Sequence, residues 1–149
     1  MEYIKIRFGK NLGQMHGRIQ QTIDDMFQRV NPILSILPGE VWRPQVDIVE
    51  TEDVITVICE VSGVNKEDLS VEIDSGALKI SGKREEPFGS SIRRYHLVEI
   101  PYGNFERILM LPVSIDQNRV TASYNNGVLR IEMAKPVAGK EHSVPIQGE

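Results

Sequence analysis

Apolar and polar side chains alternate along most of residues 42–135, which is the pattern of half-buried β-strands. In the clearest run, 54–61, every second side chain is apolar, namely Ile55, Val57, Cys59 and Val61. The alternation returns at 69–73, 77–81 and 127–133, with turn signals between the runs. The strongest turn is Asn126-Gly127, because this pair readily adopts the positive φ angles of a type I′ hairpin. Asn65 is the expected cap of a single helical turn. Short strands at this spacing predict an all-β sandwich or barrel, not a parallel sheet.

The first 41 residues follow a different pattern, with apolar side chains at helical spacing. A helix predicted over residues 19–30 carries one apolar stripe, formed by Ile19, Ile23, Met26, Phe27 and Val30. Asn31-Pro32 ends it, and a second apolar run stops at Pro38-Gly39. This helix either covers the sandwich or belongs to an arm that needs a partner. The chain thus divides into an N-terminal arm (1–41), a β-rich domain (42–135) and a C-terminal tail (136–149).

A long excursion interrupts the β-rich domain. Residues 84–94 are charged and contain proline and glycine, and residues 95–100 then have the pattern of another strand. A strand at the end of a long loop cannot easily complete its own sheet. Its unpaired N–H and C=O groups therefore favour pairing with another chain. The alternative is an ordinary hairpin that folds back onto the sheet of the same chain.

The tail carries a short apolar motif, Val144-Pro145-Ile146. In extended backbone Val144 and Ile146 point the same way, and the proline favours that conformation. Two apolar side chains presented in this way suit strand addition to a groove on another molecule. Burial of each contributes roughly 1.5–3 kcal/mol, much of it lost to ordering the tail. One contact is therefore weak, and only many contacts together would hold an assembly.

Length and composition narrow the class of protein. The 149 residues are 40% hydrophobic and 26% charged, which suits one packed domain with arms. The formal net charge of −4 argues against nucleic acid or an anionic membrane as the main partner. No apolar stretch approaches the roughly 18 residues of a membrane helix. No secretory signal is evident, so the expected localisation is cytoplasmic.

Candidate catalytic and metal-binding groups are sparse. His16, His96 and His142 lie one in each segment, without a companion at ligand spacing. Residues 76–83 only approximate a phosphate-binding loop, because five residues separate the glycines where four are required. Cys59, the only cysteine, lies on the apolar face of its strand and is expected in the core. The sequence therefore predicts neither an enzyme nor a protein with a metal or other cofactor.

Several motifs resemble those of the small heat-shock proteins, the α-crystallin domain family. Residues 122–129 match the A-x-x-x-N-G-x-L hairpin near the end of that domain, and residues 103–112 match its G-x-F-x-R-x-x-x-L-P strand. Residues 61–69 resemble the family's Pro-Gly turn, with Ser62 in place of proline. The tail motif resembles I-x-I/V. The resemblance covers residues 42–146, and Ile100 departs from it where the family often has an arginine that forms a dimer ion pair.

The resemblance implies an ATP-independent chaperone, or holdase, that binds exposed apolar surface of unfolding proteins and prevents their aggregation. It also implies an immunoglobulin-like sandwich that dimerises and assembles into a larger homo-oligomer, as in bacterial and plant members. A strand exchanged onto the partner's sheet would form the dimer, together with an interface arginine: Tyr95, His96, Leu97, Val98, Glu99, Ile100 and Arg107. The tail motif would dock in a groove of a neighbouring dimer, for which alternation selects Leu69, Val71, Ile73, Val120 and Ala122. Client proteins would bind apolar residues of the arm: Phe8, Ile19, Ile23, Met26, Phe27, Ile33, Leu34, Ile36 and Leu37.

Two other functions compete with this interpretation. A p23-like sandwich co-chaperone, which docks on one dedicated partner, would lack both the exchanged strand and the tail motif. A β-sandwich carbohydrate binder would need exposed aromatic platforms. The aromatic residues of this chain are instead scattered, with Trp42 at the start of the domain.

Overall fold

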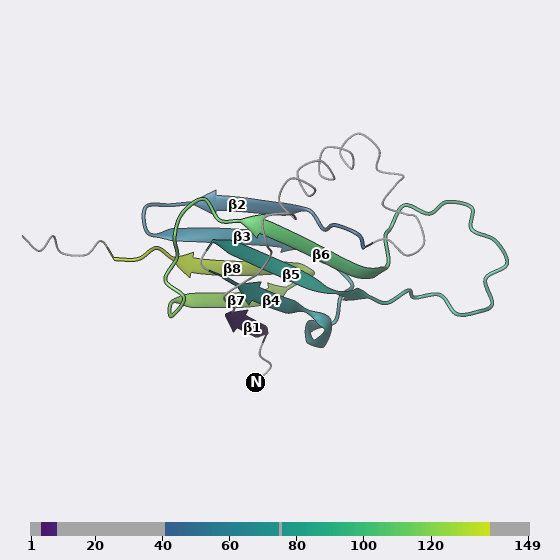
Figure 1. Ribbon diagram of the computed structural model, residues 1–149. Coiled ribbons are helices and arrows are strands. Elements are labelled where there is room, and N and C mark those ends of the chain that lie inside the picture. Colours follow the sequence, from purple (N-terminus) through teal and green to yellow (C-terminus); the bar gives the residue numbers. More distant parts are fainter. Residues whose placement is uncertain (1–3, 9–40, 75, 138–149) are drawn as a thin grey trace, which may run out of the picture.

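A computed structural model of the chain describes residues 4–8, 41–74 and 76–137, which form two β-sheets packed face to face (Figure 1). The strands are β1 (Lys5–Phe8), β2 (Val46–Glu50), β3 (Val54–Glu60), β4 (Ser70–Ile73), β5 (Ala77–Arg84), β6 (Gly103–Met110), β7 (Val120–Asn125) and β8 (Val128–Ala134). One sheet has the order β1-β4-β5-β6 and the other β2-β3-β8-β7. The predicted two-sheet sandwich is confirmed. The helix predicted over residues 19–30 and the tail motif lie outside the described residues.

The inward faces of both sheets share one hydrophobic core. Each of the alternating apolar runs points its predicted face inward, which buries Ile55, Val57, Cys59, Val61, Leu69, Val71, Ile73, Leu129, Ile131 and Met133. Removing these aliphatic side chains from water is the main favourable contribution to folding. The period-two pattern therefore selected the correct face of β3, β4 and β8.

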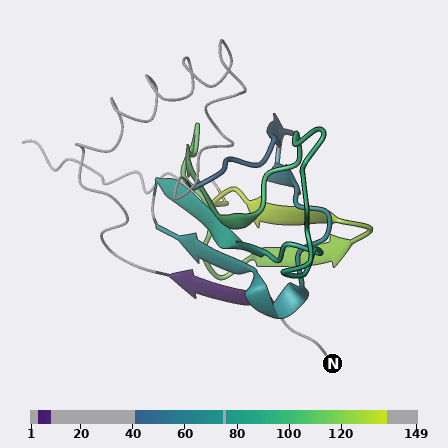
Figure 2. The same cartoon turned by 90° about the vertical axis from the view of Figure 1, so that its right-hand side faces the viewer.

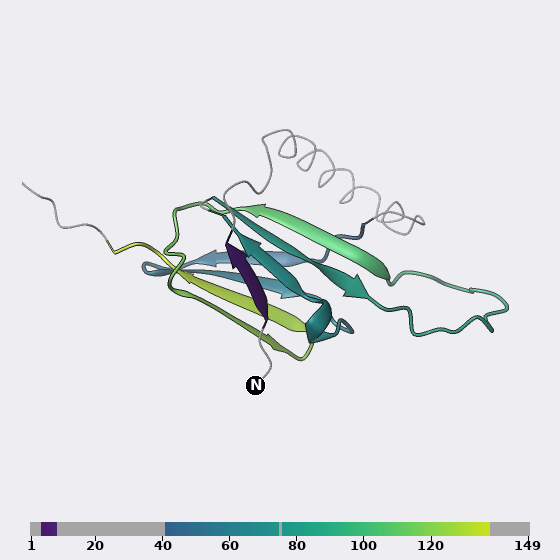
Figure 3. The same ribbon diagram turned by 60° about the horizontal axis from the view of Figure 1, so that its bottom comes forward.

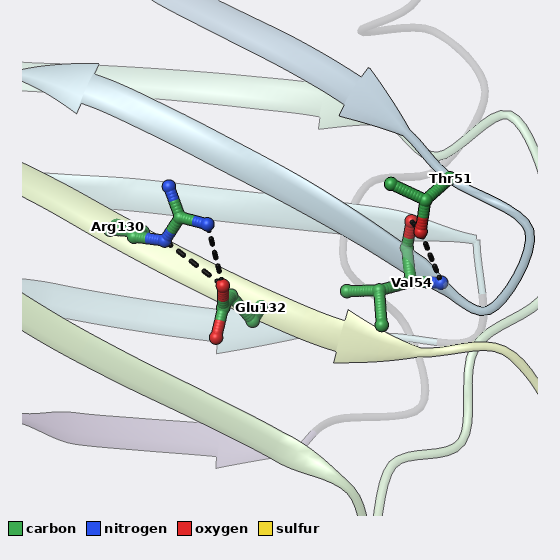
Figure 4. A network of polar contacts seen from close by, with 4 residues as sticks. All are labelled: Thr51, Val54, Arg130 and Glu132. Carbon is green, nitrogen blue, oxygen red and sulfur yellow. Dashed lines mark hydrogen bonds and ion pairs between the residues drawn. The ribbon is translucent and has the colours of Figure 1, made fainter.

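Tight turns fix the register of the second sheet. Asn126 (φ 51°) and Gly127 (φ 79°) form the predicted two-residue turn between β7 and β8. At the β2–β3 turn, the Val54 N–H donates to the Thr51 hydroxyl oxygen at 3.1 Å (Figure 4). The Thr51 N–H donates to the Val54 carbonyl oxygen at 2.8 Å. Because side chain and backbone both close this turn, β2 cannot easily slip along β3.

A single 3-10 turn, Lys66–Asp68 (η2), precedes β4 where a helical turn was predicted. Asn65 occupies the N-cap position, but its side chain makes no capping bond, so this part of the prediction is wrong. The Asp68 N–H already donates to the Asn65 carbonyl oxygen at 3.0 Å. The Asn65 side-chain amide instead donates to the Asp68 carboxylate at 3.2 Å.

Strand β1 was not predicted from the sequence. This strand lies along β4 and pairs with it in parallel, with Lys5 opposite Ser70 and Phe8 opposite Ile73 (Figure 3). All other pairs between the described strands are antiparallel. The sequence does contain a strand pattern here, because apolar and charged side chains alternate over residues 4–8.

Candidate functional site

The predicted tail-accepting groove lies on β4 and β7, one strand from each sheet. Both strands lie at the same side of the sandwich, opposite β2 and β6 (Figure 1, Figure 2). On β4 and immediately before it, Leu69, Val71 and Ile73 are buried. On β7, Val120 and Ala122 are half-buried and pack against the same core. The structure thus brings all five predicted residues to one margin of the core.

The outer edge of β4 is occupied by β1. Ile6 in that strand and Ile4 immediately before it are half-buried and pack against the core, whereas Lys5 and Arg7 are exposed. Apolar side chains two residues apart therefore already lie at the margin where the tail motif was expected. Docking of the tail motif stays a prediction, because its residues lie outside those described.

Tyr124 closes one end of this margin, a role that sequence reasoning missed. Its hydroxyl lies 2.9 Å from the carbonyl oxygens of both Val61 and Val64, and its single proton is shared between these two acceptors. Burial raises the pKa of Tyr124, which keeps the hydroxyl protonated and able to donate. The neutral hydroxyl joins β7 to the loop that follows β3.

The segment 95–100 forms no strand in this structure of a single chain. It lies in the long loop between β5 and β6 that extends away from the sandwich (Figure 1). Its apolar side chains are largely in water: Leu97 is 76% exposed and Ile100 57% exposed. The alternative hairpin, folded onto the sheet of its own chain, is therefore not what forms. Exchange of this segment onto a partner needs a second copy and stays a prediction.

Aromatic contacts organise the loop from within. The Phe88 ring packs edge-on against Tyr95 and Tyr102, with ring centroids 6.5 and 6.4 Å apart. The Tyr95 hydroxyl donates to the Glu86 carboxylate at 2.6 Å. This hydrogen bond raises the pKa of Tyr95. These contacts hold the two sides of the loop together while its remaining apolar side chains face solvent.

Arg84 anchors the base of the loop, a role for which the sequence gives no signal. Its Nε donates to the Ser62 carbonyl oxygen at 2.8 Å, and its Nη1 donates to the Pro101 carbonyl oxygen at 2.9 Å. The guanidinium carbon lies 4.1 Å from the centroid of the Trp42 ring, a cation–π distance. Trp42 in turn packs on Phe105, with ring centroids 4.9 Å apart. One buried cation therefore joins the two ends of the loop to the core.

The edge of β2 is open on the side away from β3. Its side chains include two exposed aliphatic residues, Ile48 (40%) and Val49 (50%). Near the start of this strand, Arg107 Nη1 donates to the Pro44 carbonyl oxygen at 2.8 Å. The predicted position of Arg107 in a dimer interface needs a second copy and stays a prediction. An open edge with exposed aliphatic side chains is a surface on which another strand can add.

The outer face of the β3-β8-β7 region is polar by contrast. Arg130 Nη2 lies 2.6 Å from the Glu132 carboxylate on β8 (Figure 4). Both side chains are about half exposed, so this ion pair contributes little to stability. Charged side chains therefore occupy the middle of β8 on this face, whereas the exposed side chains of β2 include two aliphatic ones.

Of the predicted arm residues, only Phe8 lies within the described part of the chain. It is the last residue of β1 and is 49% exposed. The other arm residues lie outside the described ranges, so their part in client binding stays a prediction.

The described residues contain little reactive chemistry. Cys59 is fully buried, and burial raises its pKa to about 12. The thiol therefore stays protonated, whereas a nucleophile or a metal ligand must be a thiolate. Within the described ranges, no three His, Cys, Asp or Glu residues are grouped to hold a metal ion. None of the helices described there is long and apolar enough to cross a membrane.

Comparison with known proteins identifies a family. The model of the Hsp20/alpha crystallin family matches residues 47–147. Small heat shock protein C4 of Rickettsia felis is 32% identical over 139 residues, which cover 89% of this chain and 85% of that protein. Heat shock protein 16 of Schizosaccharomyces pombe is 35% identical over 120 residues, which cover 76% of this chain and 83% of that protein. A solved small heat-shock protein from Xylella fastidiosa superposes with a TM-score of 0.63 at 31% identity, covering 73% of this chain and all of the other.

Proposed function

The chain belongs to the Hsp20/alpha crystallin family of small heat shock proteins, and we propose that it is a holdase that binds apolar surface of unfolding proteins and prevents their aggregation. Members of this family are typically ATP-independent chaperones, not enzymes. The observation that carries the proposal is the match over residues 47–147, which includes strands β3 to β8, nearly all of β2, and the tail motif. A chaperone without ATP can act only by mass action, so it must present apolar surface of its own.

The dimer would form by exchange of the segment 95–100 onto the open edge of β2 in a second copy. Two observations support this pairing: the segment is exposed and unpaired in the single chain, and Ile48 and Val49 on β2 are exposed. Strand addition would satisfy the backbone groups of both elements and cover these side chains. Arg107, held to the Pro44 carbonyl near the start of β2, would then border the interface.

Larger assemblies would form when the tail motif Val144–Ile146 docks at the margin of β4 and β7. The Xylella fastidiosa relative is described as having a distinct high-order structure, which supports assembly beyond the dimer. Each tail contact is weak, so subunits would leave and rejoin. Their departure would uncover the apolar side chains of the N-terminal arm for client proteins.

The client-binding role of the arm is tested in the full chain with a heat-labile client enzyme, whose aggregation is followed by light scattering. The variant Ile23→Ser/Phe27→Ser should lose most of its suppression of scattering, because it removes two large apolar side chains from the predicted stripe. The matched control Gln21→Ser/Gln28→Ser changes the opposite side of the predicted helix and should keep full suppression.

Native mass of each variant completes the test. We expect both variants to stay oligomeric, because the proposed dimer and tail contacts lie elsewhere. Full suppression by Ile23→Ser/Phe27→Ser would refute the client-binding role of the arm. A monomeric wild-type chain would refute the proposed assembly.

A further inference from the structure

The outer edge of β4 can hold one strand at a time. β5 occupies one edge of β4, with Ile80 opposite Val71, and β1 occupies the other, with Ile6 opposite Val71. Each N–H and C=O group on that outer edge belongs to one ladder only. A second extended segment can therefore pair with this edge only after β1 has left it.

Two segments of the chain have large aliphatic residues two positions apart, which suits pairing with such an edge. In the first segment these residues are Ile4, immediately before β1, and Ile6 within it, and both pack against the core. In the tail they are Val144 and Ile146. Because side chains at i and i+2 share one face of an extended segment, the positions that receive the first pair also suit the second. The two apolar pairs differ by one methylene group, because Val144 stands where the other segment has Ile4. Between them Pro145 stands in place of Lys5 and has no N–H to donate to the edge.

We propose that β1 is an internal competitor of the tail, so that each β4 edge holds either Ile4–Ile6 of its own chain or Val144–Ile146 of another subunit. This inference rests on the proposed assembly through the tail motif. Departure of β1 then becomes a required step before a tail can dock. The N-terminal residues thereby set how many grooves are available for assembly.

β1 is attached to the edge of β4 weakly enough to detach from it. The strand has four residues and pairs with β4 on one side only. Lys5 and Arg7 are exposed, and Phe8 keeps half of its surface in water. A short edge strand with few buried side chains opens locally at far lower free energy than the whole domain. Exchange with another strand is thus possible without unfolding the sandwich.

The competition is measured in the full chain with a labelled peptide that has the sequence of residues 138–149. All proteins carry Val144→Ala/Ile146→Ala, so that their own tails do not compete, and binding is followed by fluorescence anisotropy. If β1 holds the edge about nine-tenths of the time, its removal tightens the apparent Kd about tenfold. We therefore expect Ile4→Ser/Ile6→Ser to bind the peptide about tenfold more tightly. The matched control Lys5→Ser/Arg7→Ser should stay within about twofold, because these side chains face solvent.

Each outcome decides something different. Tighter binding by the Ile4→Ser/Ile6→Ser variant alone supports the competition. Equal binding by both variants overturns the competition but leaves tail docking intact. If neither variant binds the peptide, both the competition and tail docking are overturned. The client-binding assay still tests the holdase role separately. Unchanged Trp42 emission shows that each variant keeps its sandwich.

A reversible lock gives the opposite perturbation. Lys5 and Ser70 are opposite each other in register, so Lys5→Cys/Ser70→Cys places two thiols on neighbouring strands at a spacing that suits a disulfide. Cys59 does not interfere, because it is fully buried. The oxidised protein should bind the peptide at least about tenfold more weakly than the reduced protein, since β1 can no longer leave. Equal affinity in the two redox states would overturn the proposal.

Discussion

Arg84 provides the sharpest test of how the sandwich holds its long loop. We consider Arg84→Met, which keeps most of the side-chain volume and removes the charge and the donors. The substitution deletes the two hydrogen bonds to the Ser62 and Pro101 carbonyl oxygens, at 2.8 and 2.9 Å. It also deletes the cation above the Trp42 ring. The two ends of the loop between β5 and β6 then lose the contacts through which Arg84 joins them to Ser62 and Trp42.

The expected loss of stability can be estimated from these contacts. Hydrogen bonds that involve a charged group contribute about 1.5–3 kcal/mol each. A partly desolvated cation–π contact contributes about 1–2 kcal/mol. Burial opposes these gains, as the lowered pKa of Arg84 indicates. We therefore expect Arg84→Met to lower the free energy of unfolding by about 2–4 kcal/mol, a large part of the 5–15 kcal/mol typical of a domain.

The assay is urea unfolding followed by the fluorescence of Trp42, the only tryptophan. All variants are compared at one protein concentration, because assembly contributes to apparent stability. Arg84→Lys should show an intermediate loss, since an ammonium group cannot reproduce the planar fork that reaches both carbonyl oxygens. Arg130→Met is the matched control: it removes an exposed ion pair with Glu132 and should cost less than about 0.5 kcal/mol.

Limited digestion with trypsin gives an independent measurement at Arg93 and Arg94, which are exposed in the same loop. Cleavage there should be faster in Arg84→Met than in the wild type. Unfolding of Arg84→Met at the wild-type midpoint would contradict the anchoring role of Arg84, as would an equal loss of stability in Arg130→Met.

Two further predictions concern the core. The pKa of the Cys59 thiol is 9.0 in the unfolded chain and about 12 in the folded protein. The buried neutral thiol therefore contributes fully to the free energy of unfolding below pH 9, and this contribution declines as pH rises toward 12. Between pH 8 and 10 the free energy of unfolding should fall by about 1.4 kcal/mol more in the wild type than in Cys59→Ala; parallel pH profiles would contradict this. A Cβ on Gly82 would lie 2.4 Å from the Asp68 carbonyl oxygen and 2.6 Å from the Phe105 ring. Gly82→Ala should therefore cost about 1–3 kcal/mol in urea unfolding, whereas Gly76→Ala, which meets open space, should change stability little.

Local patterns were enough to predict most of the domain. The alternation over residues 54–61 gave the correct buried face because side chains of a strand alternate strictly between its two sides. Asn126-Gly127 gave the β7–β8 turn because few other residue pairs adopt two successive positive φ angles. Cys59 was placed in the core by the same alternation. Each of these features depends on residues close together in the sequence.

Features that join distant parts of the chain were not predictable in this way. The three partners of Arg84 are Trp42, Ser62 and Pro101, which no spacing rule connects to it. The hydrogen bonds of Tyr124 to the loop after β3 also span about 60 residues. Such contacts arise only when the two sheets pack, because packing decides which carbonyl groups lie within reach of a given donor.

The sequence by itself determined the buried faces of β3, β4 and β8 and the apolar spacing of Val144 and Ile146, because each follows from side-chain order along extended backbone. Only the tertiary structure decided that β1 takes the outer edge of β4 and that residues 95–100 find no edge within their own chain. The physical reason is that a strand edge has one row of hydrogen-bonding groups, and which segment fills it depends on the arrangement of the sheets in space.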